Sequence, residues 1–199
     1  MPSLLESLAG SLGGNNVADV IAKHVNADPQ TVRKALAVAL PLLVAALARN
    51  AQNPQGAAAL HQAVQNDHDG RVLDDVKGYL SNPDVSDGQG ILGHVLGGQQ
   101  TAAQTQVSQA TGLSTAGAGT LMASIAPLLM GAVGRAQQQG GLNPSGLSSL
   151  LGSETSAISQ NPAALGSITQ MLGGQEGGDV GDALAAAGKS LFSKFLHHE

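Results

Sequence analysis

The chain has 199 residues, of which 42% are hydrophobic, 12% charged and 2% aromatic, and its formal net charge is −5. A chain of this length forms one domain or two small ones. Its core must consist mainly of Leu, Ala, Val and Ile, because Tyr79, Phe192 and Phe195 are its only aromatic residues. The sparse, slightly acidic charge argues against binding to a polyanion, which needs a basic surface. The absence of cysteine excludes disulfides and thiolate metal sites.

Two apolar regions raise the question of a membrane. Residues Ala35 to Ala48 form an uninterrupted apolar run of 14 residues, which is shorter than the ~20 residues that a spanning helix needs. The second region, between Gly88 and Ser153, is broken by glutamines and is rich in Gly, Ser and Thr. We therefore expect buried core helices and no membrane partner. The first residues lack the basic start of a secretory signal, so we expect a cytoplasmic protein.

Two stretches of the chain are similar enough to indicate an internal repeat. The run Leu40-Pro41-Leu42-Leu43 recurs 86 residues later as Ala126-Pro127-Leu128-Leu129, and each run leads to an arginine, Arg49 or Arg135. Internal repeats of this kind determine the architecture of a protein. We predict an all-α fold of two tandem, similar helical subdomains with helix-turn-helix-like units and Gly-rich connections. The expected parts are a first unit over 1–90, a second unit over 91–174, and a Gly-rich linker with a C-terminal amphipathic helix over 175–199.

In each unit a short helix is expected to turn into a long apolar helix. Asn26 and Gly112 occupy equivalent positions, and both residue types readily adopt the left-handed conformation that ends helices. Two residues later, Asp28 and Ser114 are residue types whose side chains cap the start of a helix. Each long helix contains a proline, which removes a backbone donor, so we expect a kink or a restart there.

Asn-Pro pairs indicate a boundary after each long helix, at Asn53-Pro54 and Asn143-Pro144. Unit one then carries a charged insertion near 67–80. Its apolar residues follow helical spacing, so we expect a helix from Arg71 to Leu80, capped by Asp67 or Asp69. The apolar face of that helix comprises Val72, Leu73, Val76 and Leu80, and the side chains expected to point to water are Asp74, Asp75 and Lys77.

These features together resemble a known family. The tandem glycine-rich segments, the run Gly90-Ile91-Leu92-Gly93-His94-Val95-Leu96-Gly97 and the Pro-Leu-Leu helix ending in Arg are similar to the bacterial YidB-like family of proteins of unknown function. The resemblance extends from about Leu4 to Gly174. It implies an all-helical array rich in small residues, and it transfers no catalytic or binding residue.

The strongest functional pattern is a helix-turn-helix over Val17 to Leu36. Its second helix opens with side chains that a recognition helix offers to bases and phosphates, namely Gln30, Thr31, Arg33 and Lys34. Against DNA binding, this helix continues into an apolar run that needs burial, and the equivalent residues of the second unit carry no cation. Helix-turn-helix geometry is also an ordinary packing motif. DNA contact through these four residues therefore remains the alternative, and packing is the preferred interpretation.

Other motifs do not support a catalytic, cofactor or metal site. Asp67-His68-Asp69-Gly70 resembles part of a calcium loop, but the residues that would occupy its first and last positions, Gln65 and Val76, supply no carboxylate. Gly88, Gly90 and Gly93 match a dinucleotide fingerprint in spacing only, because no buried strand precedes them. The six histidines show no zinc spacing and are interpreted as surface residues: His24, His61, His68, His94, His197 and His198.

The sequence therefore favours a non-enzymatic protein-interaction or scaffolding module, with self-association among its expected activities. A chain with few charges leaves weakly polar surface exposed, and large weakly polar patches tend to be interfaces. No cofactor is expected. The C-terminal stretch from Leu184 to Leu196, which contains Lys189, Lys194 and both phenylalanines, can rest on a membrane surface or a partner. We favour its docking onto the protein core.

Overall fold

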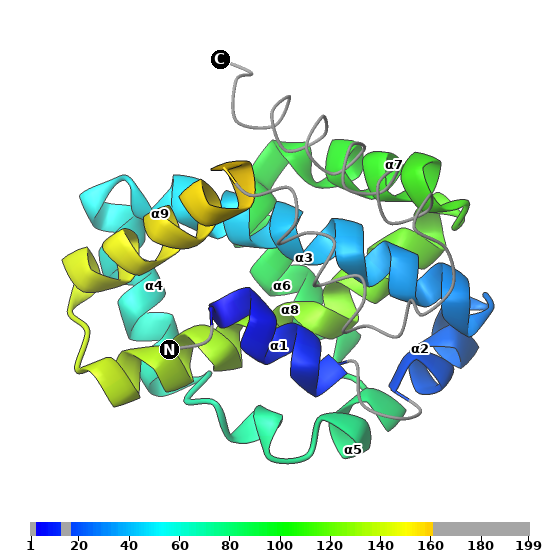
Figure 1. The fold of residues 1–199 in the computed structure, drawn as a ribbon, viewed down its shortest axis with the longest axis horizontal. Coiled ribbons are helices and arrows are strands. Elements are labelled where there is room, and N and C mark those ends of the chain that lie inside the picture. The colour runs from blue at the N-terminus through cyan, green and yellow to red at the C-terminus, as the bar shows by residue number, and fades with distance from the viewer. Residues whose placement is uncertain (1–2, 13–16, 161–199) are drawn as a thin grey trace.

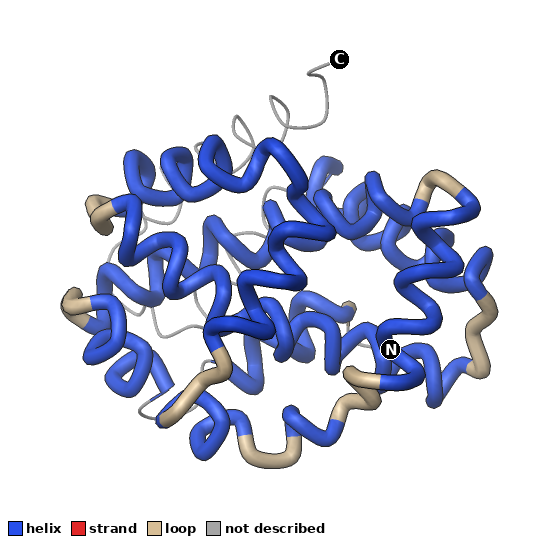
Figure 2. Tube along the Cα trace, turned by 180° about the vertical axis from the view of Figure 1, so that it is seen from behind, coloured by secondary structure: helices blue, strands red, loops and turns tan. Residues whose placement is uncertain are grey.

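The computed structural model of the protein describes residues 3–12 and 17–160. These residues form α-helices and two short 3-10 turns, with no strand within those ranges, so the all-α prediction is confirmed (Figures 1 and 2). The helices are α1 (Leu4–Leu12), α2 (Val17–Val25), α3 (Pro29–Ala51), α4 (Pro54–Asn66), α5 (Val76–Ser81), α6 (Val85–Leu96), α7 (Gln100–Thr111), α8 (Thr115–Gly140) and α9 (Pro144–Gln160), and the 3-10 turns are η1 (Arg71–Leu73) and η2 (Gly97–Gln99).

The two long helices, α3 and α8, form the centre of the fold, and the shorter helices surround them (Figure 1). Helices α2, α4, α6 and α7 each pack against both long helices. In addition, α9 packs on α3, and α1 packs on α8. The buried hydrophobic side chains of both predicted repeat units join in one cluster. The two units therefore share one core, and their status as separate subdomains stays a prediction.

Helices α3 and α8 are both long and apolar enough to cross a membrane. Their most apolar windows have mean hydropathies of 1.8 and 1.6, and 83% of each window is buried within the fold. Neighbouring helices thus cover these apolar surfaces, as is typical of core helices. Both helices run without interruption through their internal prolines, Pro41 and Pro127, so the chain does not restart at either proline.

The turns that precede the two long helices have the conformations predicted from the sequence. Asn26 and Gly112 have φ angles of 50° and 80°, in the left-handed region. The carboxylate of Asp28 accepts a hydrogen bond from the backbone N–H of Thr31 (2.9 Å), and the hydroxyl of Ser114 accepts one from the backbone N–H of Gly117 (3.0 Å). Two different sequences therefore form the same type of helix-to-helix turn.

The Asn-Pro pairs also lie where helices begin. Proline occupies the first position of α4 and of α9, where its missing N–H costs no hydrogen bond. Asn53 Oδ1 accepts a hydrogen bond from the backbone N–H of Gln55 (2.8 Å), and Asn143 Oδ1 accepts one from that of Gly146 (2.8 Å). The predicted boundaries after both long helices are confirmed.

The prediction of one helix from Arg71 to Leu80 is wrong. The segment forms the 3-10 turn η1 and then the short helix α5. The cap of α5 is Asp75, which accepts a hydrogen bond from the backbone N–H of Gly78 (2.7 Å). Asp69 Oδ1 instead accepts from the backbone N–H of Arg71 (3.1 Å), just before η1. Asp74, Asp75 and Lys77 are exposed, as predicted, while Val76 and Leu80 are buried.

Helix α8 explains why this segment is not one helix. Arg135 Nη2 donates hydrogen bonds to the carbonyl oxygen of Gly70 (2.7 Å) and to Asp74 Oδ1 (2.6 Å). The loop lies so close to α8 that a Cβ added at Gly134 would fall on the carbonyl oxygen of His68. Contact with α8, which is distant in sequence, therefore determines the backbone path of the insertion.

A buried carboxylate of α9 forms hydrogen bonds with the N-terminus of α1. Glu154 is 7% exposed, and its two oxygens accept hydrogen bonds from the backbone N–H groups of Leu4 (2.9 Å) and Leu5 (3.4 Å) at the start of α1. Ser3 and Glu6 complete the cap reciprocally: Ser3 Oγ accepts from Glu6 N (3.0 Å), and Glu6 Oε2 accepts from Ser3 N (2.9 Å). The N-terminus of α1 thus has both a local and a distant cap.

The single tyrosine provides a spectroscopic test of the packing around α5. Burial raises the pKa of Tyr79 to about 12, with a further contribution from the negative charges of Asp87 and Asp84. In an unfolded chain the phenol titrates near pH 10. Because the folded pKa is raised, the associated stability is present below pH 10 and is lost as the pH rises through 12. Phenolate absorbance of the folded protein should show a midpoint near pH 12.

A Tyr79→Phe variant is the control for this titration, because Tyr79 is the only tyrosine in the chain. The variant should give no phenolate signal, and its stability should not show the alkaline decrease assigned to this residue. A midpoint near pH 10 in protein that is still helical would contradict the described burial of Tyr79.

Candidate functional site

An open cleft of about 420 Å³ lies between α4 and α6. Both helices pack on α3 and α8, which supply part of the cleft floor through Leu47 and Met130. The residues that line the cleft are Leu47, Asn50, Gly56, Ala59, Leu60, Ala63, His68, Asp87, Gly90, Ile91, His94, Val95 and Met130.

The floor of the cleft is apolar. Leu47, Leu60 and Met130 are buried, whereas Ile91 and Val95 of α6 are half-buried and pack against the core. A small cavity of about 10 Å³ is lined by four of these floor residues, Leu47, Ile91, Val95 and Met130, together with deeper side chains of α3, α6 and α8. The cleft therefore borders the hydrophobic core directly.

Small residues form the walls. Ala59 and Ala63 lie on α4, and Gly90 lies on α6. Gly56 of α4 also lines the cleft, but a Cβ added there would fall on the carbonyl oxygen of Asn50 at the end of α3. A Cβ added at Gly90 would meet no heavy atom within 4 Å, so the space beside this helix is open. The small residues at positions 59, 63 and 90 allow the backbone of another element to approach these parts of the walls closely.

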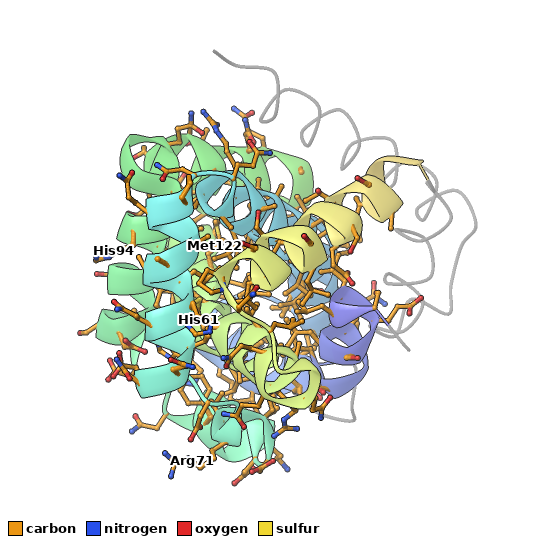
Figure 3. All side chains as sticks on the ribbon, turned by 90° about the vertical axis from the view of Figure 1, so that its left-hand side faces the viewer. His61, Arg71, His94 and Met122 are labelled. Atoms are coloured by element: carbon orange, nitrogen blue, oxygen red, sulfur yellow. The ribbon has the colours of Figure 1, made fainter. Side chains whose placement is uncertain are left out.

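Four polar residues also line the cleft: Asn50, His68, Asp87 and His94. Asn50 Nδ2 donates a hydrogen bond to the backbone oxygen of His94 (2.9 Å). His94 Nδ1 lies 2.8 Å from the carbonyl oxygen of Gly90, and because a carbonyl only accepts, Nδ1 is the donor. In the neutral ring, Nε2 therefore carries the lone pair and can accept a hydrogen bond. Figure 3 shows His94 on the outer side of α6, away from the buried Met122.

These polar groups can donate and accept hydrogen bonds, but they do not form a metal centre. Within residues 3–12 and 17–160, no group of three or more His, Cys, Asp or Glu side chains is placed to hold a metal ion. Asp87 and His94 are exposed, as is Asn50. The arrangement suits recognition of a partly apolar ligand that also carries polar groups.

The four residues considered for DNA contact lie at the start of α3, whereas Leu47 and Asn50 of the cleft lie near its other end. Gln30 is exposed, and Arg33 and Lys34 are half-buried. The Thr31 hydroxyl donates a hydrogen bond to Asp28 Oδ2 (2.6 Å) and is thus engaged in the helix cap.

The charge at this end of α3 does not favour a polyanion. Hydrogen bonds from the side chain and the backbone of Thr31 hold the pKa of Asp28 below its ordinary value. Asp28 is therefore negatively charged at neutral pH and lies immediately before the proposed recognition residues. A carboxylate at this position repels phosphate and offsets part of the attraction supplied by Arg33 and Lys34.

The structure gives the acidic loop, the glycine run of α6 and the described histidines local structural roles or exposed positions rather than a ligand site. Asp69 pairs with Arg71 (Oδ2 to Nε, 2.6 Å), which Figure 3 places at the periphery of the protein. Gly88, Gly90 and Gly93 lie inside α6, so they do not form the strand-to-helix turn that a dinucleotide site requires. His24 is exposed, and His61 Nε2 lies 3.2 Å from the carbonyl oxygen of Leu142. The predicted Gly-rich linker and amphipathic stretch within 175–199 lie outside the described residues, as do His197 and His198.

Interpretation of the histidines as unrelated surface residues missed one relation: His68 and His94 line the same cleft. They come from the insertion loop and from α6, so no fixed spacing in the sequence connects them. The glycine and alanine residues of α4 and α6 were a weak sequence signal for the cleft, because small residues on a helix indicate that another element approaches it closely.

Comparisons with known proteins identify the family. Neither the curated proteins nor the solved structures include a significant match to the chain. The model of the family DUF937, described as a bacterial protein of unknown function, matches residues 6–137, about two-thirds of the chain. The matched region contains every residue that lines the cleft and agrees with the resemblance to YidB-like proteins. The chain therefore belongs to this bacterial family of unknown function.

Proposed function

We propose that the protein is a non-enzymatic interaction module that binds a helical segment of a protein in the cleft between α4 and α6. The observation that carries this proposal is an open apolar floor bounded by small residues on two helices. An amphipathic helix that lays its apolar face into such a groove is a recurring mode of peptide recognition. A second copy of the chain counts as a partner in this proposal, and we place the interaction in the cytoplasm.

The chemistry of the cleft supports binding rather than catalysis. Catalytic groups generally act in water-excluded sites where neighbours perturb their protonation. Here Asp87 and His94 are exposed at the margin of the cleft, and the floor offers only apolar side chains. The volume of about 420 Å³ also falls within the range of small-molecule sites, but the small-residue walls specifically favour the close approach of a helix.

Affinity capture of the intact protein from its host, with bound proteins and nucleic acids both identified, tests this proposal. Ala59→Glu places a charge in the cleft, and Ala58→Glu is the matched control, because Ala58 is also exposed on α4 but does not line the cleft. We expect a defined protein partner whose recovery falls at least about tenfold in Ala59→Glu, since burying an unpaired charge is costly. Ala58→Glu should retain the partner.

The alternative function, DNA association through the start of α3, makes the opposite prediction for the same experiment. Charge reversal of Arg33 and Lys34 should leave the protein partner bound if the cleft is the interaction site. Recovery of a defined DNA that is lost on this charge reversal and retained in Ala59→Glu would overturn the proposal.

A further inference from the structure

We infer that residues 184–196 of the same chain occupy the cleft between α4 and α6. This inference rests on the proposal that the cleft binds a helical segment, and it names the segment. The partner considered above would then have to displace these residues.

The pattern of residues 184–196 matches the chemistry of the cleft. A helix over this segment would bring Leu184, Leu191, Phe192 and Phe195 to one face, because their spacing follows the helical period. Lys189 and Lys194 fall outside this apolar stripe. An apolar stripe with flanking lysines complements an apolar floor whose charged margin residue is Asp87.

Aromatic side chains give this segment its expected affinity. Both phenylalanines of the chain lie in it, and the only other aromatic residue, Tyr79, does not line the cleft. Large aromatic side chains dominate the energetics of many interfaces. The chain thus combines an apolar cleft bordered by small residues with one segment that carries its phenylalanines.

The segment can reach the cleft within one molecule. Residues 161–183 connect it to the end of α9, and at ~3.3 Å per residue they span up to about 75 Å. A compact domain of this size has a radius of gyration of about 15 Å, so no surface point is out of reach. Helix α9 also packs on α4, which forms one wall of the cleft. A tethered segment has a millimolar effective concentration, which favours it over a second copy.

Cysteine crosslinking of the purified, full-length protein tests the inference. The chain contains no cysteine, so two introduced thiols are the only ones. The test pair is Ala59→Cys with Gly188→Cys, and the control pair is Ala58→Cys with Gly188→Cys. Gly188 falls in the apolar stripe of a helix over 184–196, and its replacement removes no apolar side chain. A short bismaleimide reagent joins the two thiols and tolerates small differences in the position of the segment along the cleft.

We expect the Ala59 pair to form an intramolecular crosslink at least about tenfold faster than the Ala58 pair at the effective concentrations of a tether. Adding Phe192→Ala and Phe195→Ala to the protein with the Ala59 pair should lower its crosslinking rate to that of the Ala58 pair. Equal rates for the two pairs, or crosslinks that join two chains, would overturn the inference. The crosslinking uses purified protein without a partner, so a negative result does not decide whether a partner binds the cleft. The capture experiment with Ala59→Glu tests that proposed function independently.

Discussion

Replacing Gly88 by alanine should destabilise the protein by about 2–3 kcal/mol, because adding a methyl group to a tightly packed contact typically costs about 1–3 kcal/mol. Gly88 is buried in α6, and a Cβ built on it would fall on the carbonyl oxygen of Ala123 in α8. The obstacle is backbone, which cannot rotate away as a flexible side chain can. Helix α6 would have to move away from α8. Urea unfolding followed by helical circular dichroism measures this loss.

Gly90→Ala is the matched control for this prediction. Gly90 lies two residues later in the same helix, and a Cβ added there would meet no atom within 4 Å. Alanine is preferred over glycine in a helix interior by about 0.5–1 kcal/mol, so this variant should be slightly more stable than the natural protein. If Gly88→Ala were as stable as Gly90→Ala, the described contact between α6 and α8 would be wrong.

Replacing Glu154 by alanine should destabilise the protein by about 2–3 kcal/mol, since hydrogen bonds to charged groups contribute about 1.5–3 kcal/mol and unpaired buried donors add a cost. The backbone N–H groups of Leu4 and Leu5 would lose their acceptor. The carboxylate also interacts favourably with the positive end of the α1 dipole. We expect early exchange of the α1 amides, measured by hydrogen exchange, in addition to a lower urea midpoint.

Two further variants separate this distant cap from other effects. Glu154→Gln retains an acceptor oxygen but removes the charge, so it should lose less stability than Glu154→Ala. Ser153→Ala removes a neighbouring exposed side chain that bonds only within α9, to the carbonyl oxygen of Leu150 (2.7 Å), and should have little effect. Protection of the α1 amides that is unchanged in Glu154→Ala would contradict the assigned contact.

Local features of the fold were predictable from the sequence because they depend on a few adjacent residues. Asn26 and Gly112 have the backbone conformations that their residue types favour, and Asp28 and Ser114 cap the long helices as expected. The Asn-Pro pairs mark helix starts for the same reason. Each of these features requires only a side chain and a backbone group within three positions of it.

Features that depend on distant contacts were not predictable. The apolar spacing of residues 71–80 indicated one helix, but hydrogen bonds from Arg135 and close contact with Gly134 impose a different path. The cap supplied by Glu154 joins residues about 150 positions apart. The cleft likewise combines residues from α3, α4, α6, α8 and the insertion loop, so its existence depends on the tertiary arrangement of these elements.

Site-specific photocrosslinking in host cells tests whether the cleft between α4 and α6 is a protein-binding surface. A photoreactive residue is introduced at Ala59, which lines the cleft, or at the adjacent Ala58, which is exposed outside it. We expect a discrete protein crosslink from position 59, to a partner or to residues 184–196, and none from position 58. Indistinguishable crosslinking patterns from the two positions would show that the cleft is not the binding surface.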